Sequence, residues 1–482
     1  MRKRRSPVNE NGSGLGGRPA AVRSAPSRAG GSPAPASVSP ARRIAYQVLR
    51  RADAGPDLAA DLLRAPEVSE LPEADRNLAT ELVLGTLRRR AELDLWITRL
   101  SGKPLEYFDS EVALALRLGI YQIRLLHRIP NSAAVNEAVE MVKAARKRSA
   151  AGLVNAVLRK CPPMDPACQG IDADSLRLAL PSWLGDRWAR QFGREAVGEL
   201  ARWSLESPRV TVRITEPGCQ AEEIQQELAR EGIAARPSSL LNSGGGGESP
   251  ALRIERGSIT RSKLWQSGAL VIQDEASQLV GSLLRPEPGQ RVLDLCAAPG
   301  MKTAQIAAGL GHGLLVACDR SARRLRHLAD LPPGLAVRRH LVRLDASQPL
   351  PFATAFDRIL LDAPCSGTGT LARNPEIKWR LQPADLERLA EMQTRMLAGA
   401  LEALAAGGRL LYATCSLETE ENESVVEKVL AQKRGFRRLV PAEVIADRPA
   451  LAPLFDQDGY FRTRPDLHEM DGFFAALIGR EA

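Results

Sequence analysis

The chain has 482 residues, too many for one hydrophobic core, and its length predicts two to four domains. Its seven cysteines include no Cys-x-x-Cys pair and no metal-ligand spacing, which favours a reducing cytoplasm, predicts no metal site and argues against a disulfide framework. No uncharged apolar run reaches the roughly 18 residues of a membrane span, and no apolar segment typical of a secretory signal follows the basic start. Composition therefore excludes a membrane-spanning protein.

The net charge of +9 is concentrated at the start of the chain. Residues 1–40 contain seven Arg and Lys against one Glu, which leaves only +3 for everything that follows. This segment is rich in Gly, Pro and Ser and nearly lacks large apolar side chains, so we expect a disordered basic leader. Global charge is therefore weak evidence about the folded part, and local clusters must be considered instead.

The next 165 residues are helical in pattern. From Ser39–Pro40 onward apolar residues recur three and four apart, no alternating run occurs before about residue 205, and Pro130–Ser132 is expected to cap a helix. We predict an all-α bundle over 41–165 and a helical connector over 166–205. A local basic cluster in the bundle could contact phosphate; it consists of Lys143, Arg146, Lys147 and Arg148.

A small α+β module is predicted over residues 206–270. Arg209–Ile214 alternates with the period of a strand, 222–231 has the pattern of a helix, and 251–254 is a second strand candidate.

From 271 to 482 apolar strand-like runs alternate with helical patterns, which predicts an α/β domain with a parallel sheet. A polar or nucleophilic residue comes at the carboxyl end of each of five runs: Cys296, Asp319, Asp345, Asp362 and Cys415. Cys365 follows Asp362 closely. Since open α/β sheets bind ligands at this edge, we expect these side chains to form one site.

The first of these loops has the features of a nucleoside-cofactor site. Asp319 lies 25 residues beyond Asp294, a spacing suited to an acid that accepts ribose hydroxyls. The loop lacks the G-x-G-x-x-G of dinucleotide sites, which favours S-adenosylmethionine, a cofactor without phosphate. The predicted cofactor residues are Cys296, Ala297, Ala298, Pro299, Gly300, Met301, Lys302, Asp319, Asp345 and Asp362.

Several motifs resemble known families. Those at 294–303, 361–369 and 413–416, with support from 273–277, 373–379 and 470–474, resemble the RNA 5-methylcytosine methyltransferases. Segments 129–139 and 154–158 resemble NusB, an RNA-binding antitermination factor, and this combination is similar to bacterial enzymes of 16S rRNA. The resemblance implies a NusB-like bundle, an RRM-like module and a Rossmann-like class I methyltransferase domain. Met301 stands where the family often has glycine, and a positive φ there would strain it.

The resemblance also implies a mechanism. Cys415 is the nucleophile that adds to carbon 6 of cytosine, which makes carbon 5 able to accept the methyl group. Cys365 helps to resolve the adduct, and Asp362 holds the base and positions the cofactor. Four further cysteines are expected to be structural, namely Cys161, Cys168, Cys219 and Cys318. Three acids close to Cys415 oppose its ionisation: Glu418, Glu420 and Glu421.

The expected partner is RNA, namely 16S rRNA or an early small-subunit assembly intermediate, bound by a cytoplasmic monomer. The target cytosine must be single-stranded or flipped out of its helix. Trp379 could stack on RNA or pack beneath the active-site loop. Three alternatives remain: a DNA cytosine methyltransferase that attacks through Cys365, a tRNA methyltransferase, and a non-catalytic assembly or antitermination factor.

Overall fold

The computed structural model describes residues 38–55, 57–163, 173–216, 218–242, 250–329 and 336–481. Residues 1–37 of the expected leader, and Cys168, lie outside these ranges. Within the described ranges, no helix is long and apolar enough to cross a membrane.

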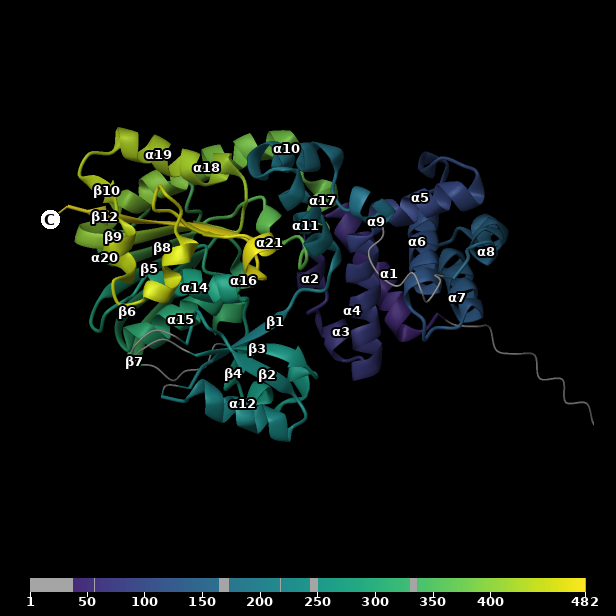
Figure 1. Ribbon diagram of the computed structural model, residues 1–482, viewed down its shortest axis with the longest axis horizontal. Helices are drawn as coiled ribbons and strands as arrows, with labels where there is room; N and C mark the ends of the chain where they lie inside the picture. The colour runs from purple at the N-terminus through teal and green to yellow at the C-terminus, as the bar shows by residue number, and fades with distance from the viewer. Residues whose placement is uncertain are drawn as a thin grey trace, which may run out of the picture. The chain divides into compact units, whose positions relative to one another are not determined.

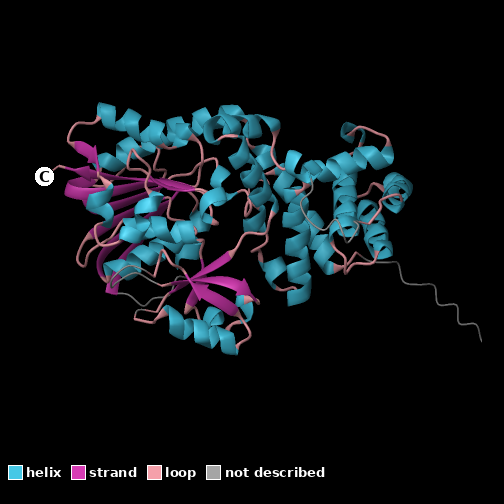
Figure 2. Cartoon of the chain, in the orientation of Figure 1, coloured by secondary structure: helices cyan, strands magenta, loops and turns pink. Residues whose placement is uncertain are grey.

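The first described region is entirely helical (Figures 1 and 2). Its longer helices are α1 (Pro40–Ala54), α4 (Glu73–Arg88), α5 (Arg90–Ser101), α6 (Ser110–Leu125), α7 (Asn131–Ala144) and α8 (Ala151–Arg159), and its short ones are α2 (Ala59–Leu62) and α3 (Pro66–Ser69). Helix α6 is buried on all sides from Val112 to Ile123, as expected for the central helix of a bundle. Within the expected cap at 130–132, Pro130 is the N-cap of α7 and makes no side-chain capping bond, and Asn131 and Ser132 already belong to the helix.

A helical connector leads to a small antiparallel sheet. The connector consists of α9 (Ala173–Arg177), α10 (Ser182–Phe192) and α11 (Arg194–Leu205). The sheet has the order β2-β3-β1-β4 and is packed with helix α12 (Ala221–Arg230). Its strands are β1 (Val210–Ile214), β2 (Ala234–Pro237), β3 (Ala251–Arg256) and β4 (Leu270–Ile272). Only β1 and β3 were predicted, because β2 and β4 are too short to show alternation.

The third region is built on a larger sheet of order β10-β12-β9-β8-β5-β6-β7, in which β11 also pairs with β12. The strands β5 (Arg291–Leu295), β6 (His312–Asp319), β7 (Ala336–Arg343), β8 (Phe356–Asp362) and β9 (Leu404–Thr414) run parallel. These are the five strands that the sequence predicted, and they are parallel as expected. Strand β12 (Phe473–Arg480), which was not predicted, lies antiparallel to β9. Strands β10 (Phe436–Arg438) and β11 (Phe461–Thr463) are also antiparallel to β12.

Helices cover both faces of this sheet. Figure 1 shows α18 and α19 on one side of the strands, and α14 and α15 on the other. One core joins the sheet to α18 (Pro383–Glu402) and α19 (Glu423–Gln432), and a second joins it to α14 (Glu275–Leu283) and α15 (Met301–Leu310). The remaining helices are α13 (Lys263–Gln266), α16 (Ala322–Ala329), α17 (Ile377–Arg380), α20 (Pro441–Ile445) and α21 (Pro465–His468).

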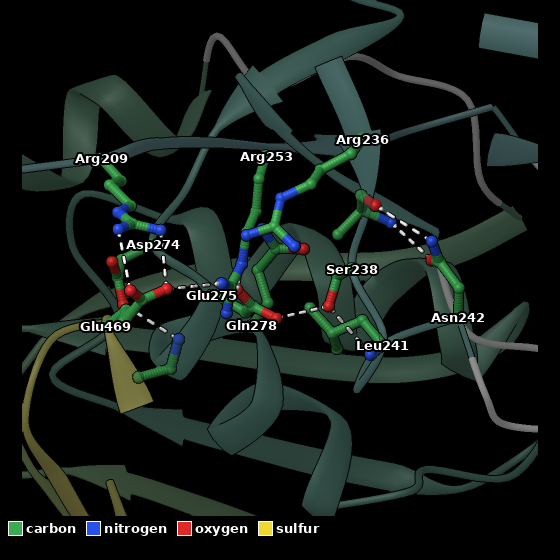
Figure 3. Close-up of polar contacts among 12 residues, drawn as sticks. Arg209, Arg236, Ser238, Leu241, Asn242, Arg253, Asp274, Glu275, Gln278 and Glu469 are labelled. Atoms are coloured by element: carbon green, nitrogen blue, oxygen red, sulfur yellow. Dashed lines mark hydrogen bonds and ion pairs between the residues drawn. The ribbon is translucent and has the colours of Figure 1, made fainter. Parts of the chain in front are cut away.

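A polar network connects the small sheet to the large one (Figure 3). The buried carboxylate of Glu275, at the start of α14, accepts hydrogen bonds from Arg253 of β3 and Ser238. Arg209 forms a two-pronged ion pair with Glu469, at 2.7 and 2.9 Å. The Glu275 contacts hold the small sheet beside α14, which precedes the first strand of the large sheet, and the Arg209–Glu469 pair fastens the start of the module to the end of α21.

Candidate active site

The cofactor loop predicted at 296–302 follows β5 and leads into α15. Cys296 has a φ of 67° and Gly300 a φ of 109°, so two residues in left-handed backbone reverse the chain between strand and helix. Gly300 is the N-cap of α15 and Met301 is its first helical residue. The strain considered for Met301 therefore does not arise, because the glycine already present occupies the position that requires positive φ.

Asp294 lies on β5 directly beneath this loop. Its side chain is buried, one oxygen accepts a 2.6 Å hydrogen bond from Thr303, and the other has no hydrogen-bond partner among the described residues. Burial raises the pKa of the Asp294 carboxyl to about 7. An orphaned buried carboxylate oxygen is costly, so this position is suited to a hydrogen-bond donor from a bound ligand.

The other predicted cofactor acids are held by their own loops. Asp319 accepts hydrogen bonds from the backbone N–H of Ser321 at 2.7 Å and of Ala298 at 3.4 Å, which connects the end of β6 to the cofactor loop. Asp345 accepts bonds from the hydroxyl and the N–H of Ser347, and these bonds lower the pKa of Asp345. Both carboxylates lie at the carboxyl edge of the sheet, but Asp345 mainly stabilises its own turn.

The two cysteines at the ends of β8 and β9 lie together. The Sγ atoms of Cys365 and Cys415 are 3.3 Å apart, and both residues are half-buried. The hydrogen bond with Cys415, together with burial, raises the pKa of the Cys365 thiol well above its ordinary value. Cys365 therefore keeps its proton at neutral pH and can donate it toward the sulfur of Cys415.

A cation lies beside the thiols. Lys302, from the first turn of α15, donates a 2.8 Å hydrogen bond to Asp362 at the end of β8. Burial alone would lower the pKa of Lys302, but Asp362, Cys415 and Asp294 outweigh burial and raise it. Lys302 is thus a permanent positive charge between the cofactor loop and the cysteines. The sequence suggested the charge but not its pairing with Asp362.

A buried cluster beneath the cysteines was not predicted. The carboxylate of Glu421 accepts hydrogen bonds from the hydroxyls of Ser366 and Ser416, from the N–H of Ser366 at 2.8 Å, and from Gln393 at 2.9 Å. The two serines directly follow Cys365 and Cys415, and their hydroxyls are 3.0 Å apart. Glu421 therefore fastens both cysteine loops to one point. A serine after each cysteine was the only sequence signal for this cluster.

The other two acids near Cys415 are neutralised from a distant segment. Arg187 of α10 forms ion pairs with both Glu418 and Glu420, and the indole N–H of Trp188 donates to Glu418 at 3.0 Å. The guanidinium of Arg187 therefore compensates the negative charge of these two acids. It comes from the connector, because the local sequence around Cys415 contains no arginine or lysine.

The segment after the Cys365 loop is fastened to the helical region. The indole N–H of Trp379 donates to the backbone oxygen of Leu87 at 2.7 Å, and the buried Lys378 donates to that of Arg88 at 3.0 Å. Arg88 in turn donates to the backbone oxygen of Ala372. These contacts favour packing of Trp379 over stacking on RNA, but the indole packs at the end of α4 and not beneath the active-site loop.

Sequence and structure comparisons identify the family of the chain. A family model for the 16S rRNA methyltransferase RsmB/F matches residues 281–479, a NusB family model matches 39–162, and an RsmF/B-like ferredoxin-like domain matches 180–244. A probable ribosomal RNA small subunit methyltransferase B from Synechocystis is 32% identical, over 91% of this chain and 99% of the relative. The chain belongs to the RsmB/F methyltransferase family.

Further relatives extend the match. The ribosomal RNA small subunit methyltransferase B of Pseudomonas putida is 33% identical over 86% of this chain and 92% of its own length. The crystal structure of PH0851 superposes with a TM-score of 0.74 at 24% identity, covering 93% of this chain and all of that one. A methyltransferase homologue from Pyrococcus horikoshii is 27% identical, with a TM-score of 0.51 over 66% of this chain and 100% of its own. The family and the fold class predicted from the sequence are confirmed. The protein described by this structure is an RNA methyltransferase.

Proposed function

We propose that the protein transfers a methyl group from S-adenosylmethionine to carbon 5 of a cytosine in 16S rRNA, through a covalent bond between Cys415 and carbon 6. The observation that carries this proposal is the 3.3 Å separation of two thiol sulfurs at the ends of adjacent parallel strands. A single attacking group would not need a second cysteine so close. A reaction that first forms and then breaks a carbon–sulfur bond has a use for both.

The residues around the cofactor loop fit a nucleoside cofactor that carries an ammonium group. The unpartnered oxygen of Asp294 can accept a donor such as this ammonium, and Asp319 lies where a second acid can accept ribose hydroxyls. No glycine-rich phosphate cradle is present at 296–302. When bound, S-adenosylmethionine would supply an electrophilic methyl group; positioning and proton transfer are left to the protein.

The proposed steps follow from the arrangement of the site. The Cys415 thiolate forms a bond to carbon 6, and the electron pair that this addition releases makes carbon 5 nucleophilic. Asp362 holds the ring nitrogen or amine of the base, while Lys302 limits the build-up of negative charge around Asp362 and Cys415. After methylation, a base removes the carbon 5 proton, the carbon–sulfur bond breaks, and the Cys415 thiolate is released. Cys365, which otherwise keeps its proton, assists this last stage.

A pair of cysteine variants tests the proposal. Purified Cys415→Ala and Cys365→Ala proteins are incubated with 16S rRNA and S-adenosylmethionine, and denaturing gels are used to detect covalent protein–RNA complexes. Cys415→Ala should form no complex, whereas Cys365→Ala should accumulate one. The opposite pattern would assign the attack to Cys365, as in the DNA-type alternative.

The identity of the RNA needs a separate measurement. Bisulfite sequencing of total RNA from a deletion strain should show one 16S rRNA cytosine that loses its protection. Loss of protection in a tRNA instead would favour the tRNA alternative. Failure of the protein to bind S-adenosylmethionine at millimolar concentration would favour the non-catalytic factor.

A further inference from the structure

Beyond the leader, one stretch of the chain carries a large surplus of positive charge that the proposed chemistry does not use. Residues 320–344 contain seven arginines against one aspartate, a surplus of six. Because residues 41–482 carry only +3 in total, the remainder of this region is net negative by three. The surplus at 320–344 is therefore larger than the net charge of the whole chain beyond residue 40.

The structure places most of this charge on α16 and at the ends of β6 and β7. Arg323, Arg324 and Arg326 of α16 are exposed, while Leu325 and Leu328 of the same helix are buried. Arg320 and Arg343 are also exposed, and Arg343 donates a 3.3 Å hydrogen bond to the backbone oxygen of Arg320. These five side chains are here called the arginine face.

The helical arginines of this face are available for a partner. No ion pair joins Arg323, Arg324 or Arg326 to any carboxylate in the described part of the chain. Unpaired charges of one sign repel each other at close range, so the arrangement costs stability unless an anion shares the surface. Charged side chains can also protect the edge strand of a sheet from pairing with another chain. That role would need the charges on the edge strand β7 itself, whereas most arginines of this face lie on α16 or before it.

The arginine face also lies at the catalytic edge of the sheet. Arg320 follows Asp319 at the carboxyl end of β6, and Arg343 ends β7. Strands β9, β8, β5, β6 and β7 are successive and parallel, so their carboxyl ends form one edge. With ~4.8 Å between neighbouring strands, the end of β7 is about 19 Å from the end of β9, where Cys415 lies. Nucleotides that flank a cytosine at Cys415 can reach this distance.

We propose that the arginine face binds the phosphodiester backbone of the substrate RNA beside the target cytosine. The proposal rests on the assignment of RNA as substrate. It adds a second RNA contact surface, separate from the one expected on the NusB-like domain. Guanidinium groups bind phosphate through paired hydrogen bonds and do not lose their charge, which suits them to a contact without sequence preference. The complementary partner for this group of exposed arginines is therefore the RNA backbone.

A matched pair of triple variants tests the proposal. Arg323→Gln, Arg324→Gln and Arg326→Gln are combined in one protein. The control combines Arg395→Gln, Lys428→Gln and Arg434→Gln, which remove the same charge from exposed positions on or next to α18 and α19. Binding of a 16S rRNA fragment is measured without cofactor as a function of salt.

The arginine-face variant should bind about tenfold or more weakly at low salt. Its slope of log K against log salt should be smaller by roughly 0.7–0.9 for each phosphate that the variant no longer neutralises. The control variant should keep the wild-type slope, and S-adenosylmethionine affinity should be unchanged in both proteins. Equal slopes for the arginine-face variant and the wild type would overturn the proposal. Weakened binding only to RNA that carries ribosomal proteins would also overturn it, in favour of an acidic protein partner.

These outcomes are separable from the proposed chemistry. The binding measurement requires no methyl transfer, so a product other than 5-methylcytosine would refute the proposed reaction and leave the arginine face standing. With saturating RNA, the arginine-face variant should keep kcat within about twofold of wild type while the KM for RNA rises. A loss of kcat with unchanged KM would contradict a docking role.

Discussion

Lys302 and Asp362 form an ion pair, 2.8 Å long, between the cofactor loop and the end of β8, the strand that precedes the Cys365 loop. The lysine side chain is 11% exposed and also lies 4.9 Å from the centre of the Phe473 ring. The pair therefore connects the two halves of the proposed reaction: the loop expected to hold the methyl donor and the strand end expected to hold the base.

Replacement of Lys302 by Met should reduce kcat/KM by about a hundredfold, because it removes a fixed positive charge from beside Asp362 and Cys415. The raised pKa of Lys302 means that the charge is present across the whole neutral and mildly alkaline range. Single-turnover methylation of 16S rRNA measures the effect. Lys302→Arg keeps the charge and should recover part of the loss. Wild-type activity in Lys302→Met would show that this charge has no part in the reaction.

Binding of S-adenosylmethionine should depend on pH through Asp294. Its carboxyl has a pKa raised to about 7, so below pH 7 the group is increasingly protonated and can no longer pair with a ligand ammonium. The Kd should level off above about pH 7.5 and weaken up to about tenfold for each unit below 7. Calorimetry in buffers of different ionisation enthalpy should also detect proton release on binding near pH 6.

Asp294→Asn is the control for this pH dependence. Asparagine keeps an acceptor for Thr303 but cannot ionise, so the variant should bind weakly and with no slope between pH 5.5 and 7.5. A wild-type Kd that is flat over this range would rule out Asp294 as the titrating group.

The Cys415 loop depends on two glycines that touch. The N–H of Gly472 donates to the backbone oxygen of Gly369 at 2.7 Å, and the N–H of Gly369 donates to that of Cys415 at 3.0 Å. A methyl group on Gly369 would lie 2.1 Å from the oxygen of Gly472, so one of the two backbone segments must move. Gly369→Ala should lower stability by about 1–3 kcal/mol and displace Cys415.

The matched substitution is Gly399→Ala in α18, where a methyl group meets no atom within 4 Å. Alanine stabilises a helix interior relative to glycine, so this variant should gain about 0.5–1 kcal/mol and keep full activity. Chemical denaturation and adduct formation are compared for both proteins. If Gly369→Ala matched Gly399→Ala in both stability and adduct formation, the close approach of Gly369 and Gly472 would not be needed for the reaction.

The motifs of the site were predictable because they are contiguous in sequence and end apolar strand runs. Cys365 and Cys415 each follow such a run, and this position alone makes them candidates for one site. The partners of these residues were not predictable, since Lys302 and Asp362 are 60 positions apart, and Glu421 and Ser366 are 55 apart. Only the order of strands in the sheet brings such pairs together.

The fold shows the same division between local and distant information. Apolar runs located the parallel strands, but an apolar run at 473–478 carries no information about its direction, and β12 proved antiparallel. The role of Arg187 depends on the connector helix α10 reaching residues 418–420, a contact across more than 200 positions. The periodicity of apolar residues indicates which face of a segment is buried, but not which other element packs against that face.

Glu421 is expected to act as a positioning residue for both cysteines. In Glu421→Gln one carboxylate oxygen becomes an amide that donates, so it cannot serve all the donors from Ser366, Ser416 and Gln393. Unsatisfied buried donors cost about 1–3 kcal/mol, and the two cysteine loops lose their common anchor. We expect kcat to fall about 10- to 100-fold while the KM for RNA and the affinity for S-adenosylmethionine stay near wild type.

The control is Glu423→Gln at the start of α19, which breaks a 2.8 Å ion pair with Arg462 away from the cysteine loops. This variant should lose stability without losing kcat. Alkylation with iodoacetamide distinguishes a positioning role from general destabilisation: Glu421→Gln should change the relative labelling of Cys365 and Cys415 under native conditions, and Glu423→Gln should not. If both variants lost stability and kcat in the same proportion, Glu421 would be a structural residue only, because a shared loss cannot arise from the geometry of two particular thiols.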